Sequence, residues 1–272
     1  MSKSYFSRLT GLLILVLLVL VALAAPLLTR YEPMAQNLDA ALQPPGAAHW
    51  LGTDLLGRDN YTRLIYGART SLFIAAASVA VSALIGVSLG TMAGFYGGWL
   101  DGLIMRIGDI FLSFPAVVFA LLMMTVMGAG AANLLISLGL TGWAGFARIT
   151  RSLVLTAKEN LYVDAARSAG GGSWWLISRH ILPNCLPQLG VYAAMGAGGM
   201  IMAEAGLSFL GVGVQPPTPS WGLMINEAKN YLVNAPWLAY YPGAAIVLAV
   251  LGFNLLGDSL REFREPRSKG MK

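Results

Sequence analysis

Long stretches without a charged residue limit most strongly how this chain can fold. The first, Leu9–Leu28, has 20 residues, almost all of them apolar. Because an α-helix rises about 1.5 Å per residue, such a run can cross the roughly 30 Å hydrocarbon core of a bilayer. Across the chain 56% of residues are hydrophobic and 11% are charged. This composition is typical of a multi-span membrane protein and leaves no room for a separate soluble domain.

Six apolar stretches are predicted to be transmembrane helices. They are Leu9–Leu28, Ser71–Phe95, a third that enters at Asp109 and Pro115 and ends at Met127, Gly128–Ile149, Leu186–Val212 and Trp237–Leu256. Within lipid every backbone polar group must be satisfied by the protein, so we expect an all-α integral membrane protein. Tyr96–Gly108 is predicted to be a turn region, and Gln215–Pro236 an external segment with a non-helical, proline-rich start.

The distribution of basic residues predicts the orientation. With the N-terminus inside, 13 of the 18 Lys and Arg residues fall in the head, the second-to-third connection, 148–179 and the tail, and five fall in external segments. This bias predicts cytoplasmic N- and C-termini. The net charge of +5 is then a topology signal rather than a sign of nucleic-acid binding. A cleaved signal peptide ending near Ala24 is the alternative for the first stretch, although the long apolar run and Pro26 argue against it.

A polar, mixed-charge island, Ala157–Asn184, interrupts the apolar pattern and must lie outside the bilayer. We predict two short helices joined by Gly170–Gly172, since three glycines permit a sharp reversal. In the first helix the 3–4 spacing places Leu161, Ala165 and Ser168 on one face.

The second helix of the island is expected to begin at the N-cap Ser173 and to end near His180. Pro183 and Pro187 are expected to mark the start of the next span. The small pair Ala165–Ala166 would let another protein approach the first helix closely, so we interpret the island as a docking surface.

The motif D-A-A-R-S-A-G, followed eleven residues after Gly170 by I-L-P, resembles the cytoplasmic EAA loop of ABC-importer permeases. Helices of that loop fit a cleft in the ATPase subunit, and this sequence has Asp164 where the family usually has Glu. The resemblance implies that the ATPase-coupling residues are Asp164, Ala165, Ala166, Arg167, Gly170, Ile181, Leu182 and Pro183. It also implies the type I ABC importer permease fold. An ordinary amphipathic connector is the alternative interpretation of the island.

The first hydrophilic segment, Thr29–Arg69, contains G-T-D-x-x-G-R-D. Gly52-Thr53-Asp54 and Gly57-Arg58-Asp59 are predicted to form paired turns, with each Asp as a turn-stabilising acceptor. The motif resembles the C-type subunit of the peptide/nickel branch of ABC permeases. The resemblance suggests two parts: residues 1–69, with the cytoplasmic head, first transmembrane helix and extracytoplasmic loop, and residues 70–272, the permease transmembrane domain with the coupling loop 157–184.

A second motif similar to this family, D-x-x-x-x-R-x-x-D-x-x-x-S-x-P, begins at Asp101. Its Asp101, Arg106 and Asp109 are predicted to form a charge cluster at the cytoplasmic edge rather than a conduction site.

Small residues recur at every fourth position in two spans, and such stripes let helix backbones pack closely in a bilayer. The stripes are Ser78, Ser82, Gly86, Gly90 and Gly94 in the second span, and Gly190, Ala194 and Gly198 in the fifth.

Glu204 lies within the fifth span, where an ionisable group is a functional candidate because it must find a partner or water. The sequence from Glu204 to Gly211 matches the family pattern E-x-x-L-S-F-L-G. Two roles remain open for Glu204: lining the substrate pathway, or pairing with a neighbouring group to hold helices together.

No residue pattern indicates catalysis. The sequence has no G-x-x-x-x-G-K-[ST] phosphate loop and no plausible Ser/His/Asp or Cys/His set. Cys185 is the single cysteine, and His49 and His180 are far apart, so no metal site is visible. We therefore predict that the chain is not an enzyme and binds no cofactor or metal.

The resemblance implies a complete importer in the bacterial cytoplasmic (inner) membrane. Two ATPase subunits would bind ATP and Mg, a second homologous permease would complete a heterodimer, and an extracytoplasmic binding protein would deliver substrate. Alternating access driven by the ATPases is the implied mechanism.

The substrate stays open at this point, because members of the resembled family carry dipeptides, oligopeptides, glutathione, or nickel and other metal chelates. Two further classes are alternatives. A secondary transporter should show inverted repeats and coupling charges in several spans, and a non-transport membrane scaffold would not need the docking loop.

Overall fold

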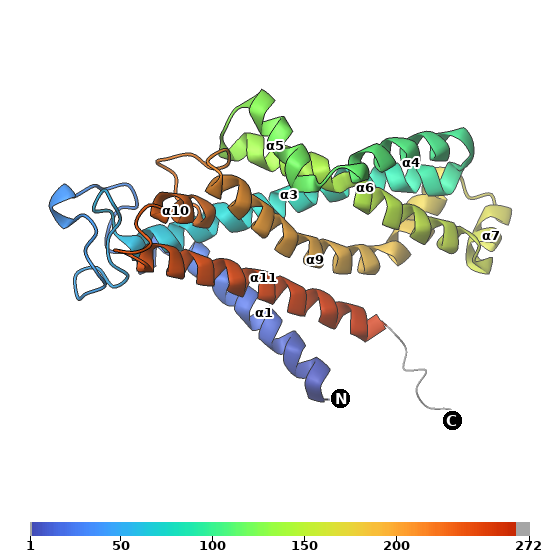
Figure 1. Ribbon diagram of the computed structural model, residues 1–272. Coiled ribbons are helices and arrows are strands. Elements are labelled where there is room, and N and C mark those ends of the chain that lie inside the picture. Colours follow the sequence, from blue (N-terminus) through green and yellow to red (C-terminus); the bar gives the residue numbers. More distant parts are fainter. Residues whose placement is uncertain (1, 265–272) are drawn as a thin grey trace.

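The computed structural model describes residues 2–264, and these residues form a bundle of α-helices joined by loops (Figure 1). Its helices are α1 (Ser2–Leu23), α2 (Ala25–Leu28), α3 (Asn60–Tyr96), α4 (Gly98–Ser113), α5 (Ala116–Met127), α6 (Ala131–Lys158), α7 (Leu161–Ser168), α8 (Ser173–Leu176), α9 (Leu182–Phe209), α10 (Trp221–Ala228) and α11 (Trp237–Arg264). Within the described residues the only β-type pairing is an isolated bridge between Thr53 and Asp59. The predicted all-α class is confirmed.

Length and composition identify three helices that could cross a membrane: α3, the continuous helix Ser173–Phe209, and α11. The bent pair α4 and α5 makes a fourth if it counts as one span, and the apolar part of α1, Leu9–Leu23, is shorter. The total of six spans therefore stays a prediction. Residues 265–272, half of the predicted basic tail Gly257–Lys272, lie outside the described residues. Helix α3 runs across the predicted boundary between residues 69 and 70.

The predicted turn region Tyr96–Gly108 is wrong. Gly97 and Gly98, with φ angles of 65° and 61°, reverse the chain within two residues, and α4 begins at once. Pro115 then breaks the helix, because its ring disfavours the helical conformation at Phe114, which is extended. As a result α4 and α5 meet at an angle of 90°.

The second helix of the polar island also differs from the prediction. Its N-cap is Gly172 rather than Ser173, and it does not end near His180 but continues through Ile177–Ile181, a π-helical turn, into α9. A proline ring clashes with the carbonyl four residues earlier in a regular helix. The wider π turn immediately before Pro183 relieves that contact, so the prolines lie inside one long helix.

The core of the bundle is the pairing of α3 with α6, and the first small-residue stripe lies at this contact. All five of its residues are buried. Ser82 donates a hydrogen bond to the carbonyl of Gly139 at 2.8 Å. A Cβ atom on Gly86 or Gly90 would lie 2.4 Å from the backbone oxygen of Trp143 or Ala147. The structure thus confirms a close helix contact at this stripe.

The second stripe is used only in part. Gly198 is buried and would place a Cβ atom 3.4 Å from Asn254 of α11, whereas Gly190 is exposed with open space around it. Only the Gly198 end of this stripe packs against another helix in the described chain.

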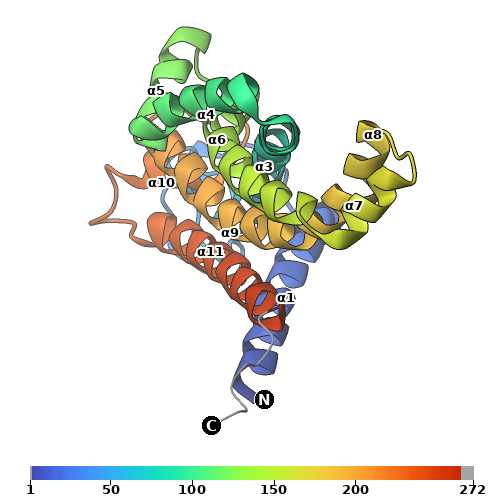
Figure 2. The ribbon, with the colours of Figure 1, turned by 90° about the vertical axis from the view of Figure 1, so that its right-hand side faces the viewer.

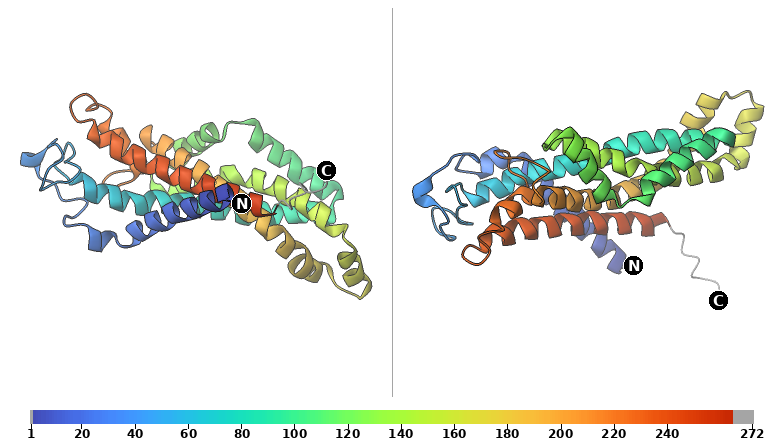
Figure 3. Two further views of the ribbon diagram at one scale, coloured as in Figure 1. Left: turned by 90° about the horizontal axis from the view of Figure 1, so that it is seen from below. Right: turned by 45° about the horizontal axis from the view of Figure 1, so that its top comes forward.

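The two ends of the bundle carry different structures. The loop between α2 and α3 lies with α10 at one end, and α7 lies at the other (Figure 1). Figure 2 shows α7 and α8 projecting away from the bundle, while α1 crosses beside α11. In Figure 3 the same projection extends past the ends of α3 and α6. The predicted docking surface is therefore well separated from the loop of paired turns.

Candidate functional site

The projecting segment formed by α7, the glycine turn and α8, here called the coupling hairpin (residues 159–181), is anchored in the core. Val163 has no exposed surface and packs in one cluster with Leu176, Ile181 and Cys185. Ala166 is half-buried against the same cluster. These contacts attach the hairpin to the bundle as one packed unit.

The turn of the hairpin uses glycine where the backbone requires it. Gly170 has a φ of 91°, a left-handed conformation that side chains rarely adopt. Next to it, the Gly171 N–H donates to the carbonyl of Ala166 at 3.1 Å, and a Cβ atom on Gly171 would lie 2.8 Å from that oxygen. The predicted reversal at the glycines is confirmed.

The coupling hairpin exposes several apolar side chains. Leu161 is 86% exposed and Trp174 is 79% exposed, and Ala165 is exposed as well. Asp164 and Arg167 form an exposed ion pair at 3.3 Å. Large exposed apolar side chains with a charged pair nearby are typical of a surface that meets another protein.

The residues predicted to couple the chain to an ATPase do not all lie on this face. Asp164, Ala165, Arg167, Gly170 and Pro183 are exposed, Ala166 and Leu182 are half-buried, and Ile181 is fully buried. The buried and half-buried members position the hairpin instead of presenting a surface. The sequence interpretation missed Trp174, although a tryptophan pair beside three glycines in a polar segment was a usable signal.

Glu204 is completely buried between helices. Its carboxylate accepts hydrogen bonds from the hydroxyl groups of Ser71 on α3 and Ser208 on α9, both at 2.9 Å. The Ser71 oxygen in turn accepts the N–H of Trp221 at 3.2 Å, and the Ser208 oxygen accepts the N–H of Val214 at 3.1 Å. Glu204 therefore joins α3, α9 and the start of α10. This geometry supports the helix-pairing role, and the pathway role stays a prediction.

At the opposite end the G-T-D-x-x-G-R-D motif builds the predicted paired turns. Gly52 and Gly57 have φ angles of 72° and 68°. Asp54 accepts the backbone N–H groups of Leu56 and Arg58, both at 2.9 Å. Asp59 caps α3 by accepting the N–H of Thr62 at 2.8 Å. Each aspartate is thus a turn or cap acceptor, as predicted.

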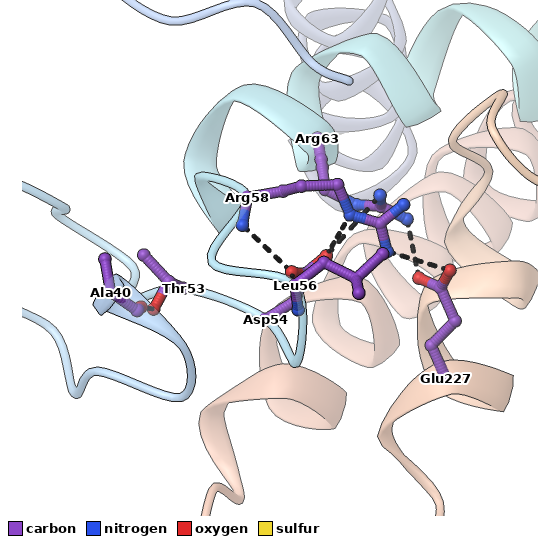
Figure 4. Close-up of polar contacts among 7 residues, drawn as sticks. All are labelled: Ala40, Thr53, Asp54, Leu56, Arg58, Arg63 and Glu227. Atoms are coloured by element: carbon purple, nitrogen blue, oxygen red, sulfur yellow. Dashed lines mark hydrogen bonds and ion pairs between the residues drawn. The ribbon is translucent and has the colours of Figure 1, made fainter. Parts of the chain in front are cut away.

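The same motif enters a buried ion network that the sequence did not predict (Figure 4). Arg58 pairs with Asp54 at 2.6 Å and with Glu227 of α10 at 2.9 Å. Arg63 pairs with Glu227 at 2.6 Å, and its Nη1 lies 3.4 Å from Asp54 without hydrogen-bond geometry. The side chains of Arg58 and Arg63 are only 3% and 1% exposed. Two cations and two anions alternate here, so the buried network carries no net charge.

Asp101, Arg106 and Asp109 of α4 do not form the predicted cluster with one another. Instead, the two aspartates form separate ion pairs with α6. Asp101 accepts two hydrogen bonds from Arg151, and Asp109 pairs with Arg148 at 2.5 Å. Arg106 is exposed. Lys158 of α6 also donates a hydrogen bond to the carbonyl of Gly94 in α3, at 2.9 Å. Three of the five basic residues between 148 and 179 thus contact neighbouring helices.

Ligand groups for a metal ion are scattered in this fold. Among residues 2–264, no three His, Cys, Asp or Glu side chains form a group that could hold one. His49 contacts Asp59 at 2.8 Å, and the His180 ring lies between those of Trp175 and Tyr162, at 4.6 and 6.3 Å.

Sequence comparisons place this architecture among known proteins. Residues 86–270 match the family described as the binding-protein-dependent transport system inner membrane component, and residues 8–45 match the N-terminal TM domain of oligopeptide transport permease C. The dipeptide transport system permease protein DppC of Alkalihalophilus pseudofirmus is 41% identical over 95% of this chain and 85% of its own length.

Two further relatives are comparably similar. The glutathione transport system permease protein GsiD of Pectobacterium atrosepticum is 43% identical over 95% of this chain and 86% of its own. The probable D,D-dipeptide transport system permease protein DdpC of Escherichia coli K12 is 38% identical over 96% and 88%. All three relatives are named as permease proteins of transport systems. The chain therefore belongs to the binding-protein-dependent inner membrane permease family of ABC transporters.

Proposed function

We propose that this chain is one permease subunit of an ATP-driven importer for short peptides, a class that includes dipeptides and glutathione. The observation that carries the proposal is its identity of about 40% with dipeptide and glutathione permeases over almost the whole of both chains. Nickel and other metal chelates have no such support and become an outcome of the test. Membership of the family sets aside the secondary-transporter and scaffold alternatives.

The coupling hairpin is proposed as the contact with one of two ATPase subunits. Its support is the exposed apolar face of Leu161, Ala165 and Trp174 on a segment packed into the core. The second half of the hairpin is the first part of a continuous helix of 37 residues, Ser173–Phe209. A displacement of the hairpin would therefore be passed along α9. Alternating access would follow if the two ATPase subunits close and open on ATP hydrolysis.

The remaining partners follow from the same proposal. A second, homologous permease subunit would complete a heterodimer, and an extracytoplasmic binding protein would deliver substrate to the end that carries α10. Both chain termini and the coupling hairpin would then lie in the cytoplasm, in agreement with the bias of Lys and Arg. ATP and Mg would be bound by the ATPase subunits.

The experiment that tests the proposal is ATP hydrolysis by the purified complex. The complex is reconstituted with its binding protein added empty, loaded with a dipeptide, loaded with glutathione, or loaded with a nickel chelate. We expect stimulation by a peptide-loaded form and none by the nickel form. Stimulation by the nickel chelate alone would contradict the substrate class, and failure of any ATPase subunit to co-purify would contradict the coupling role.

A further inference from the structure

A cavity of about 710 Å³ opens between three helices on the side of the bundle. Val19 and Leu23 of α1, Phe73 of α3, and Ala132 and Leu135 of α6 are among the residues that line it. Leu23 and Phe73 are 68% and 67% exposed, so the cavity is open outward rather than sealed in the core. We call it the α1–α3–α6 groove.

The groove has one charged residue, Arg69, in its lining. Arg58 and Arg63, which precede it in the chain, are buried and form ion pairs with Asp54 and Glu227. Arg69 differs from them: it is exposed, and within the described chain it contacts the ring of Tyr66 at 5.8 Å but forms no ion pair. A guanidinium group with free donors is suited to two parallel hydrogen bonds with a phosphate.

The position of Arg69 along α3 fixes its depth in the membrane. No charged residue occurs between Arg69 and Asp101, and this run of apolar and small residues is long enough to cross the hydrocarbon core. Arg69 therefore lies at one polar boundary of the bilayer. From that boundary the groove continues toward the apolar centre along Phe73, Ala132 and Leu135. Its polar end thus lies at the depth of lipid headgroups, and its apolar part lies at the depth of acyl chains.

The extent and charge of the groove distinguish two occupants. Its lining on α3 runs from Arg69 to Ile74, about 8 Å along the helix axis, so a transmembrane helix packed here would be contacted over less than two turns. A flexible hydrocarbon chain fits such an irregular, apolar space without a matching surface of its own. Its attached phosphate would also meet Arg69, which an apolar helix would leave unpaired.

We propose that the α1–α3–α6 groove is a phospholipid site, in which one acyl chain occupies the apolar part and the phosphate binds Arg69. Because no carboxylate among the described residues pairs with Arg69, the site favours an anionic headgroup such as that of phosphatidylglycerol. The inference depends on the chain lying in a membrane and is independent of which solute the importer carries.

Two substitutions test the site separately. Arg69→Gln removes the phosphate contact, and Ala132→Trp fills the groove from an exposed position without opening the core. Lys229→Gln and Ala244→Trp are the matched controls, since both residues are exposed and neither lines the groove. The complex is purified in mild detergent, exchanged into phosphatidylglycerol–detergent mixtures, and its retained phospholipid is counted by native mass spectrometry.

We expect the unaltered complex and both controls to retain phosphatidylglycerol. Arg69→Gln should need about tenfold more lipid for equal occupancy, as a lost charge-assisted hydrogen bond implies. Ala132→Trp should also need more lipid, because the indole ring takes the space of the acyl chain. Equal retention by all five proteins would overturn the proposal. Co-purification of the ATPase subunits shows in each case that the complex has assembled.

A crosslink identifies the occupant directly. In a Cys185→Ser background, which removes the single native cysteine, Phe73→Cys carries a benzophenone group into the groove. After illumination of membranes we expect a phospholipid adduct on this chain, whose mass decreases on phospholipase treatment because an ester bond of the attached lipid is cleaved. An adduct with the second permease subunit instead would show that a protein fills the groove and would overturn the lipid assignment.

Discussion

Asp54 shows how much of this molecule depends on single carboxylates. It closes a turn through two backbone N–H groups and also balances two arginines that have almost no exposed surface. The turn role was predictable, because Gly-x-Asp patterns have a local geometry. The pairing with α10 was not, since Arg58 and Glu227 are 169 positions apart and no local pattern joins them.

We expect Asp54→Asn to destabilise the end of the bundle that carries α10. The asparagine oxygen can still accept the turn hydrogen bonds, but two buried arginines would share one carboxylate, and breaking a buried pair costs roughly 3–5 kcal/mol. Thermal unfolding of the detergent-solubilised chain measures the change. Asp164→Asn is the control, because its ion pair is more than half exposed and should contribute less than about 1 kcal/mol. Similar losses for both variants would argue against the buried network.

Glu204→Gln is expected to lower the stability of the assembled permease while leaving transport per assembled complex unchanged. The amide accepts hydrogen bonds on one side only, so either Ser71 or Ser208 loses its acceptor, at a cost of about 1–3 kcal/mol. Yield of complex and uptake by equal amounts of complex are the two measurements. Normal assembly with lost uptake would establish the pathway role instead.

At the scale of elements, hydropathy predicted where most helices lie but not how they are joined. Helix α4 was missed because Gly97-Gly98 and the charged residues Asp101 and Arg106 resemble a turn, whereas Asp101 in fact pairs with Arg151 of α6. The helix boundary predicted at Pro183 is wrong for the opposite reason, since a π turn keeps the helix continuous there. The small-residue spacing in α3 predicted its close contact with α6 correctly, because two helix backbones at this distance leave no space for larger side chains.

Gly90→Ala tests that contact. The new Cβ atom would lie 2.4 Å from the Ala147 oxygen, so α3 and α6 must separate, and overpacking of this kind costs about 1–3 kcal/mol. Gly102→Ala in α4 is the control, because open space surrounds it and a helical glycine-to-alanine change is neutral or stabilising by up to about 1 kcal/mol. The difference in unfolding midpoint between the two variants is the readout, and equal midpoints would contradict the close approach.

The coupling hairpin gives a second test at this scale. Ala165→Trp adds bulk to the exposed face, so we expect loss of ATPase stimulation by loaded binding protein with normal membrane insertion. Ala166 is the wrong position for this test, because its half-buried side chain packs against the core. Val233→Trp, at a side chain 94% exposed in the segment between α10 and α11, is the control. Unchanged stimulation in Ala165→Trp would remove the docking assignment.

For the whole molecule, orientation is the property on which the proposed function depends. The described helices place the hairpin and the loop of paired turns at opposite ends (Figure 1). The number of spans between them could not be confirmed from length and composition, because α6 is not among the helices that qualify, the apolar part of α1 is short, and α4 and α5 form a bent pair.

Cysteine labelling tests the orientation. In a Cys185→Ser background, Leu38→Cys and Trp174→Cys introduce thiols at side chains that are 69% and 79% exposed at the two ends. A membrane-impermeant maleimide added to spheroplasts should label position 38 strongly and position 174 only after permeabilisation. The reverse pattern would invert the proposed topology, and labelling of both before permeabilisation would contradict the placement of the bilayer between them.

The continuous helix Ser173–Phe209 has a mechanical consequence. Its irregular features, the π turn and two prolines, all lie within the first 15 residues, so its stiffness is lowest near the hairpin. The 17 residues from Pro187 to Glu204 form an arm about 25 Å long. A tilt of about 5° at Pro187 would swing Glu204 through about 2 Å, the scale of a hydrogen bond. If the coupling hairpin moves as proposed, this helix would bend near the hairpin and transmit the motion to Glu204.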